Sequence, residues 1–167
     1  MATAEREGPE IDLIEGVAAF AAKAESMVIG AYMELALMTQ DLDRRLYGSE
    51  SFVSAVRKFV LQHSHARMRI LVHSPHSAIQ NNPRMVEFGR QLTSQIEFRE
   101  LLPERRAVVP HEYLVADGRL LLFRETPLDL EAKYYGMSPH LARLQLKDYD
   151  LLWNEAVPAQ ELRNLQL

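Results

Sequence analysis

The sequence of 167 residues contains no cysteine, and this absence excludes a disulfide framework, a thiol nucleophile and a thiolate metal site. It also contains no apolar run of the about 18 residues that a membrane-spanning helix requires. The N-terminal stretch MATAEREGPEIDLIE has neither the basic start nor the apolar core of a secretion signal. We therefore expect a cytoplasmic protein that does not associate with membranes.

The chain also has no excess of basic over acidic residues: the formal net charge is -4 and the isoelectric point is near 5.9. Nucleic-acid binders usually carry a basic surface, so this balance argues against a nucleic-acid partner. The sequence has no glycine-rich phosphate-binding loop, no GxGxxG fingerprint, no GxSxG elbow and no HExxH pair. These absences leave the common nucleotide-binding, hydrolase and metalloprotease classes without local support, and we expect neither a cofactor nor a metal ion.

Apolar residues, by contrast, make up 47% of the chain, which is enough to build one substantial core. We expect one domain over residues 1–167, with residues 1–9 flexible. Several segments show the apolar period of helices, and short apolar runs between them have the length of buried strands. The expected helices cover about residues 10–31, 49–62, 83–92 and 139–156, and the expected strands cover 34–39, 68–72 and 96–101.

The order of these segments predicts an α/β fold. Strand, helix and strand over residues 34–72 imply a right-handed crossover between two parallel strands. Further along, Asp117-Gly118 separates YLVA from RLLLF, which favours a hairpin closed by a type I′ turn. We expect a mixed, mostly parallel sheet with helices on both faces, then a C-terminal hairpin and a closing helix. Polar loops are expected at residues 40–49, 74–82 and 103–110.

The hairpin stretch PHEYLVADGRLLLFRE resembles the strand-turn-strand that carries chemistry in phospholipase D-like proteins. In that superfamily the motif is His, any residue, Lys, four residues and Asp, and the returning strand leads to a Gly-Ser pair. In this register Pro110 takes the place of the nucleophilic His, Glu112 that of the phosphate-binding Lys, and Arg124-Glu125 that of the Gly-Ser pair. Asp117 alone keeps the family identity. The element order also resembles this fold over nearly the whole chain, which is similar to one half of the two-half enzyme and to a bacterial group of small domains of unknown function.

These replacements remove the chemistry that the resemblance would imply. The family's reaction needs an imidazole to attack phosphorus and a cation to hold the phosphate oxygens. Pro110 offers no nucleophile, and Glu112 would repel a phosphate at about 4 Å by about 1 to 4 kcal/mol. Sliding the register would make His111 the nucleophile, but it would put Tyr113 in the place of the Lys and turn His111 to the other face of the strand. The resemblance therefore implies a degenerate member that keeps the scaffold without the catalyst.

Other polar residues leave alternatives open. Asp41 and Asp43 follow a predicted strand and could bind a metal ion or act as a base, but capping and salt bridges to the next two arginines are the simpler interpretation. His73 and His76 could be a pair of metal ligands, although the intervening proline favours loop histidines.

Arginines provide the best ligand hypothesis, because a guanidinium suits phosphate or carboxylate groups. Arg99, Arg105, Arg106 and Arg124 could assemble a site for a small anionic ligand if the loop folds over the sheet. Nearby glutamates favour the alternative of a solvated surface with balanced charge.

Two classes of function follow. The first is a non-catalytic binding or regulatory module that forms a homodimer, because the family's motif strands meet at a two-fold interface and the apolar LLLF hairpin would be buried against a copy. The second is an enzyme of altered chemistry with a pocket at the strand ends around Asp41, His73, His111 and Asp117. We prefer the first, assign no catalytic residue, and take these four residues and Arg124 as the candidate ligand-binding set. Convergence of three or more of them in one concave pocket would favour the enzyme.

Overall fold

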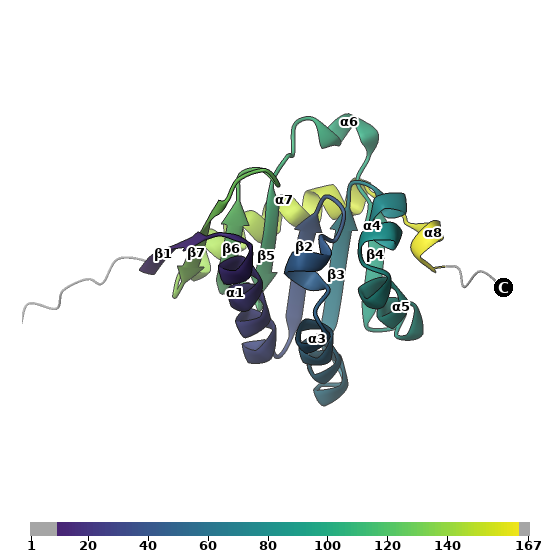
Figure 1. Ribbon diagram of the computed structural model, residues 1–167, viewed down its shortest axis with the longest axis horizontal. Helices are drawn as coiled ribbons and strands as arrows, with labels where there is room; N and C mark the ends of the chain where they lie inside the picture. The colour runs from purple at the N-terminus through teal and green to yellow at the C-terminus, as the bar shows by residue number, and fades with distance from the viewer. Residues whose placement is uncertain (1–9, 164–167) are drawn as a thin grey trace, which may run out of the picture.

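The structure, a computed structural model, describes residues 10–163, so residues 1–9, for which we expect flexibility, and residues 164–167 lie outside the described part. All strands between residues 10 and 163 join one sheet in the order β1-β7-β6-β5-β2-β3-β4-β8 (Figure 1). The strands are β1 (Glu10–Glu15), β2 (Glu34–Thr39), β3 (Arg67–Val72), β4 (Ile96–Glu100), β5 (Glu112–Ala116), β6 (Leu120–Arg124), β7 (Glu131–Gly136) and β8 (Val157–Pro158). The helices are α1 (Val17–Gly30), α2 (Arg44–Tyr47), α3 (Glu50–Gln62), α4 (Pro75–Asn81), α5 (Pro83–Gln91), α6 (Pro103–Arg106), α7 (Pro139–Glu155) and α8 (Gln160–Arg163).

The sheet has a parallel part and a larger antiparallel part. Strands β2, β3 and β4 run parallel to one another, as the strand-helix-strand order predicts. The other five pairings in the described sheet are antiparallel. The α/β class and the helices on both faces are confirmed, but the expectation of a mostly parallel sheet is wrong, because every strand outside β2–β4 joins in the antiparallel direction.

The N-terminal segment is not the single helix expected over residues 10–31. Residues Glu10–Glu15 form β1, which pairs with β7, and α1 begins only at Val17. Between them, Gly16 has a φ of 86°, a conformation that other residues rarely adopt. The apolar spacing of α1 continues across Gly16 into residues 10–15, so the sequence pattern there indicates a helix rather than β1. Its partner β7, with the sequence EAKYYG, has no apolar run that would indicate a strand.

Three of the expected loops contain short helices, namely α2, α4 and α6. At α4, the hydroxyl of Ser74 accepts a hydrogen bond from the backbone N–H of Ser77 at 3.3 Å, and Pro75 occupies the first helical turn. A capping serine followed by proline is a helix-start signal, so the turn-rich interpretation of this segment is wrong. The same kind of signal is confirmed at α3, which Ser49 caps, and at α5, which Asn82 caps.

Side chains alternate between two differently covered faces of the sheet. Helices α1, α3 and α5 pack on one face, which we call the α1 face, and α7 crosses the other, the α7 face (Figure 1). On β2, Leu37 belongs to the core of the α1 face and Met38 to that of the α7 face. The α7 face holds a smaller core in which Tyr149 and Trp153 stack at 5.9 Å between ring centres.

The predicted hairpin is confirmed. Asp117 and Gly118 have φ values of 54° and 61°, and Arg119 N–H donates to the carbonyl of Ala116 at 3.0 Å, as a type I′ turn requires. We call the end of the sheet at this turn the hairpin edge. We call the opposite end, where β2 and β3 finish and β5 begins, the strand-end edge; α6 lies beyond it (Figure 1).

The apolar residues of the hairpin are already buried within the chain. Leu121 and Leu122 are 5% and 0% exposed, because β6 lies between β5 and β7 and both faces of the sheet are covered there. The LLLF segment is therefore not the free surface that we expect a second copy to cover, and the homodimer stays a prediction without this support.

None of the helices between residues 10 and 163 combines the length and apolar composition needed to cross a membrane. The expected cytoplasmic location stays a prediction.

Candidate functional site

Glu112, the first residue of β5, lies at the strand-end edge with only 1% of its surface exposed. Its Oε1 accepts hydrogen bonds from the hydroxyl of Thr39 at 2.7 Å and from that of Tyr47 at 3.2 Å. Its Oε2 accepts from Nη2 of Arg124, with which it forms an ion pair. Both oxygens of this carboxylate are thus bound by side chains of the chain itself.

Arg124 is held as firmly as its partner. It stands directly opposite Glu112 in the β5–β6 register, and its side chain is 6% exposed. Its Nη1 donates to the carbonyl of Asp129 at 3.3 Å, and the guanidinium lies 5.2 Å from the ring centre of Phe20, close enough for a cation–π contact. Because this guanidinium is buried and paired with Glu112, a solvent anion could reach it only if the surrounding side chains moved.

The electrostatics of the pair follow from its burial. Burial raises the pKa of Glu112, while the charge of Arg124 and the hydrogen bonds from Thr39 and Arg124 limit the rise. Burial, and then the neighbouring charge of Glu112, also raise the pKa of Tyr47 well above its ordinary value, so this phenol stays protonated and serves as a donor. In the cluster of Thr39, Tyr47, Glu112 and Arg124, which we call the Glu112 cluster, the carboxylate of Glu112 is therefore fully engaged, whereas the buried Nε of Arg124 has no hydrogen-bond partner among residues 10–163.

Asp41 and Asp43 lie beside this cluster but do not join it. Asp41 accepts a hydrogen bond from the side-chain amide of Asn81 at 2.9 Å, and Asp43 caps α2 by accepting from the N–H of Arg45 at 2.9 Å. Burial raises the pKa of Asp41, and the charge of Asp43 adds to the rise. Burial acts in the same direction on Asp43, but the hydrogen bonds and charge of Arg45 outweigh it and lower the pKa of Asp43. The simpler interpretation, capping plus a salt bridge, fits the contacts of Asp43.

His73 follows β3 and is 8% exposed. Its backbone N–H donates to the carbonyls of Thr39 and Gln40, each at 3.2 Å, which fixes the end of β3 against the end of β2. Burial, and then the charge of Arg106, lower the pKa of His73. The ring is therefore neutral at pH 7. No group of three or more His, Asp or Glu side chains within residues 10–163 is arranged to hold a metal ion.

His111 faces away from Glu112, as strand alternation predicts. Its ring contacts that of Phe123 on the α7 face, with 5.0 Å between ring centres. Its Nδ1 lies 3.0 Å from the carbonyl oxygen of Glu125 and 3.6 Å from that residue's carboxylate. It lines a pocket of about 360 Å³ between α6 and α7, together with Tyr113 and Gln145.

Asp117, the one residue that keeps the family identity, lies at the hairpin edge. Its carboxylate accepts hydrogen bonds from three consecutive backbone N–H groups, those of Tyr32 at 3.1 Å, Met33 at 2.8 Å and Glu34 at 2.9 Å. These contacts fix the connection from α1 to β2. The five residues of β5 separate this edge from Glu112 by about 17 Å at 3.4 Å per residue.

The predicted residues therefore fall into separate places. Asp41, His73, His111 and Arg124 come to the strand-end edge, where each has its own partners, and Asp117 lies at the other end. The other arginines of the anion hypothesis pair with acidic side chains, Arg105 with Glu155, Arg106 with Glu100 and Arg99 with Glu97. These contacts match the alternative of a charge-balanced surface, and a ligand role for the candidate set stays a prediction.

Sequence reasoning missed that Glu112 and Arg124 bind each other. A two-residue turn of Asp117 and Gly118 would pair residue 116 with residue 119 and so residue 112 with residue 123. The observed register pairs Ala116 with Leu120, which shifts the pairing by one residue and places Glu112 opposite Arg124. Thr39 and Tyr47 carried no local signal, because the pairing of β2 with β5 brings Thr39 to Glu112 and the packing of α2 over the end of β2 brings Tyr47 there.

The family model described as "Domain of unknown function (DUF7931)" matches residues 17–165 of the chain. No curated protein sequence matches this chain. Among solved structures, 95 chains are similar. One is Nuc from Salmonella typhimurium, a phospholipase D family member, with a TM-score of 0.62 and 14% identity over 90% of this chain and 98% of Nuc.

Two longer proteins are also similar. Phosphatidylserine synthase from Haemophilus influenzae Rd KW20 has a TM-score of 0.65 and 13% identity over 94% of this chain and 40% of the synthase. TrmBL2, an archaeal chromatin protein, has a TM-score of 0.63 and 16% identity over 93% of this chain and 57% of TrmBL2. The chain thus spans less than two thirds of these two proteins. At such identities the similarity establishes the fold, and the phospholipase D-like architecture expected from the hairpin is confirmed.

Proposed function

Since the chain belongs to the DUF7931 family, a domain of unknown function, and has the phospholipase D fold, we propose a role from its own side chains: it is a binding or regulatory module that performs no phosphoryl transfer. The observation that carries this proposal is the Glu112 cluster. In the family register, Glu112 occupies the place of the phosphate-binding Lys, and its carboxylate is closed by Arg124, Thr39 and Tyr47. A phosphate entering here would meet a carboxylate rather than a free cation.

The alternative of an altered enzyme has less support from the geometry. Asp41, His73, His111 and Asp117 do not contact one another, and the two of them that line described pockets, His111 and Asp117, line different ones. General acid–base chemistry needs its groups within hydrogen-bond reach of one reacting atom. This scattered arrangement favours binding over catalysis.

The catalytic half of the proposal is tested with bis(p-nitrophenyl) phosphate. We expect the purified protein to release p-nitrophenol no faster than buffer does, and His73→Ala and His111→Ala to be indistinguishable from the unmodified chain. Release that scales with protein concentration and disappears in either variant would contradict the proposal. The paired variants distinguish activity of this chain from that of a contaminant.

The binding half is tested by thermal unfolding with phosphorylated metabolites, nucleotides, short nucleic acids and hydrophobic carboxylates. A ligand present at about 100 times its dissociation constant stabilises the folded state by about 2.7 kcal/mol, which is readily detected. We expect at least one class of small anion to raise the unfolding temperature. If none does, a small-molecule role is contradicted and only a role with a protein partner remains.

We also propose that the chain forms a homodimer, through the outer surface of α7 rather than through the hairpin. Leu144 and Leu151 lie seven residues apart on this helix and are 51% and 61% exposed, a spacing that suits packing against another helix. Val108 is 66% exposed and lines the same pocket as Leu151, which extends the apolar surface. Light scattering should give a dimer at tens of micromolar and a monomer for Leu144→Lys/Leu151→Lys. A monomeric unmodified chain would contradict the homodimer.

A further inference from the structure

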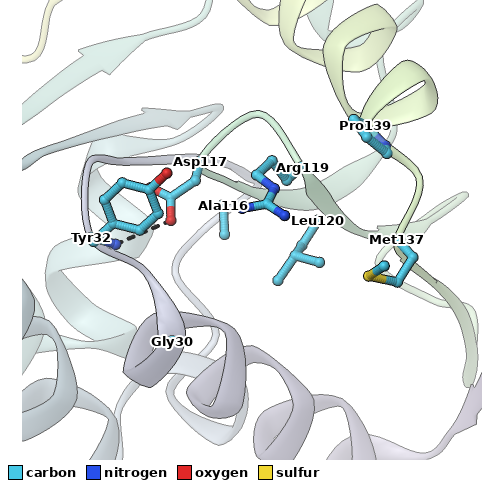
Figure 2. A pocket seen from close by; sticks show the side chains of 8 residues that line it. All are labelled: Gly30, Tyr32, Ala116, Asp117, Arg119, Leu120, Met137 and Pro139. Atoms are coloured by element: carbon cyan, nitrogen blue, oxygen red, sulfur yellow. Dashed lines mark hydrogen bonds between the residues drawn. The ribbon is translucent and has the colours of Figure 1, made fainter.

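A second concave site lies at the hairpin edge, at the opposite end of the sheet from the Glu112 cluster. It is a pocket of about 370 Å³ that draws residues from four separate segments of the chain (Figure 2). They are the end of α1, the α1–β2 connection, the β5–β6 hairpin and the start of α7. The lining residues are Gly30, Tyr32, Ala116, Asp117, Arg119, Leu120, Met137 and Pro139.

The walls of this pocket are mostly apolar and open to solvent. Tyr32 is 48% exposed and Met137 is 77% exposed, and Figure 2 shows these two side chains on opposite sides of the pocket with Leu120 between them. Met137 also has a φ of 54°, a conformation that is uncommon for a residue with this side chain. Apolar side chains exposed around a concavity mark a place where a ligand can bury them.

The polar groups of the pocket favour an anion. Arg119 makes no side-chain hydrogen bond or ion pair within residues 10–163, and its guanidinium lies over the opening between Tyr32 and Met137 (Figure 2). Asp117 also lines the pocket, but its carboxylate oxygens accept hydrogen bonds from three backbone N–H groups, which stabilise its charge and hold it against the α1–β2 connection rather than against Arg119. The start of α7 at Pro139 and the end of α1 at Gly30 both border the pocket, so the opposite ends of two helix dipoles offset each other and the positive charge there is that of Arg119.

We propose that this pocket binds a small carboxylate with an apolar body, such as a medium-chain aliphatic acid. The carboxylate pairs with Arg119, because a planar guanidinium matches a carboxylate with two parallel hydrogen bonds. The apolar body lies against Tyr32, Leu120 and Met137. The proposal deepens the binding role proposed above by naming a site and a ligand class, but it concerns different residues from the Glu112 cluster.

A phosphorylated ligand fits the same pocket poorly. A phosphate dianion is usually held by several cations or backbone N–H groups, and here it would find one guanidinium surrounded by apolar walls. A carboxylate carries one charge and leaves the rest of the ligand free to be apolar. A pocket with one cation and mostly apolar walls therefore favours a carboxylate with an apolar body over a phosphate.

Octanoate and octanamide test the charged contact, because they share an apolar body and differ in the head group. Nuclear magnetic resonance titrations of the ¹⁵N-labelled chain should show both ligands shifting the amide signals of Arg119, Leu120 and Met137. We expect octanoate to bind about tenfold more tightly than octanamide, the ratio that about 1.4 kcal/mol produces. In Arg119→Gln this preference should fall to about one. The matched control is Arg44→Gln, since Arg44 is also exposed but lies on α2 at the strand-end edge, and it should keep the tenfold preference.

Met137→Asn tests the apolar wall. Asparagine tolerates a positive φ better than most residues, so the change should remove the apolar side chain with little cost to the backbone. Both ligands should then bind about three- to tenfold more weakly, and the preference for octanoate should remain, because about 0.8 kcal/mol per buried CH₂ is lost equally from both.

Three results would overturn the proposal. They are no binding of octanoate, shifts located away from the hairpin edge, and an unchanged preference for octanoate in Arg119→Gln. Any of these leaves the binding role itself standing if another class of small anion stabilises the chain and p-nitrophenol release stays at the level of buffer. Release above that level contradicts the proposed function without affecting the octanoate result.

Discussion

The two ends of the β5–β6 hairpin treat their charged residues in opposite ways. At the strand-end edge, Glu112 and Arg124 are buried and paired with each other, so the cation is not accessible to a ligand from solvent. At the hairpin edge, Asp117 is satisfied by backbone N–H groups, and the neighbouring Arg119 is exposed without a partner within the described residues. An acidic residue that binds the backbone leaves a nearby cation free, whereas one that binds the cation directly removes it from use.

This contrast also shows that a residue that matches the family motif need not have the motif's chemical role. Asp117 keeps the residue of the family motif, and its contacts hold the α1–β2 connection in place. Glu112 and Arg124 depart from the motif, and they occupy the part of the fold where the family's chemistry would lie. The retained residue is explained by structure, and the replaced residues explain why that chemistry is not expected.

The largest expected effect comes from breaking the buried pair. Glu112→Ala leaves Arg124 buried without its counter-ion and should lower the free energy of unfolding by about 3 to 5 kcal/mol, measured by urea denaturation. In Glu112→Leu/Arg124→Met both charges are removed, and the loss should be clearly smaller. Equal losses in the single and double variants would mean that the pair is not a coupled unit and that the contrast between the two edges fails.

At the hairpin edge the corresponding change is Asp117→Ala, which removes the acceptor of three backbone N–H groups. Hydrogen bonds to a charged acceptor contribute about 1.5 to 3 kcal/mol each when buried, and this site is partly exposed, so we expect a total loss of about 2 to 3 kcal/mol. Asp117→Asn keeps one oxygen acceptor and should lose less. A loss in Asp117→Ala below that of an ordinary surface substitution would contradict the structural role of Asp117.

At the strand-end edge, the lowered pKa of His73 should make the free energy of unfolding depend on pH. Its pKa is lowered in the folded state by burial and then by Arg106, so the unfolded chain binds a proton more readily than the folded one. This contribution to stability is fully present above the unfolded pKa of about 6.5 and is lost as the pH falls below it. His73→Gln should therefore lose less stability than the unmodified chain between pH 7.5 and pH 5.5. Equal losses would show that His73 is not held neutral in the fold.

The smallest expected effect on stability is that of Arg119→Gln. An exposed side chain without an ion pair contributes little, so the free energy of unfolding should change by less than about 0.5 kcal/mol. A larger loss would mean that Arg119 supports the turn, and the weakened octanoate binding expected of this variant would then no longer report on a direct contact.

Much of this arrangement follows from local signals in the sequence. The cap at Ser49, the Asn82-Pro83 helix start and the Asp117-Gly118 turn each depend on neighbouring residues, and all three are confirmed. The errors occur where local signals conflict or are weak. Helical spacing extends across Gly16 into β1, and β7 is stabilised by its two neighbouring strands rather than by an apolar run of its own.

The site was less predictable than the fold, because its contacts join residues that are far apart in the sequence. Glu112 meets Thr39 and Tyr47 across more than 60 residues, through the antiparallel pairing of β5 with β2. The contacts of Asp117 with residues 32–34 arise from the same pairing at its other end. The register of β5 against β2 was not indicated by any local pattern, and it decides both edges.

The contrast between the two edges is tested most directly by one titration experiment on the unmodified chain, following the amide signals of residues 111–124 as inorganic phosphate and then octanoate are added. This segment runs from the strand-end edge to the hairpin edge and back. We predict that octanoate shifts the signals of residues 116–120 and that phosphate leaves those of Glu112 and Arg124 in place. Saturable shifts of Glu112 and Arg124 with phosphate, and none at residues 116–120 with octanoate, would contradict it.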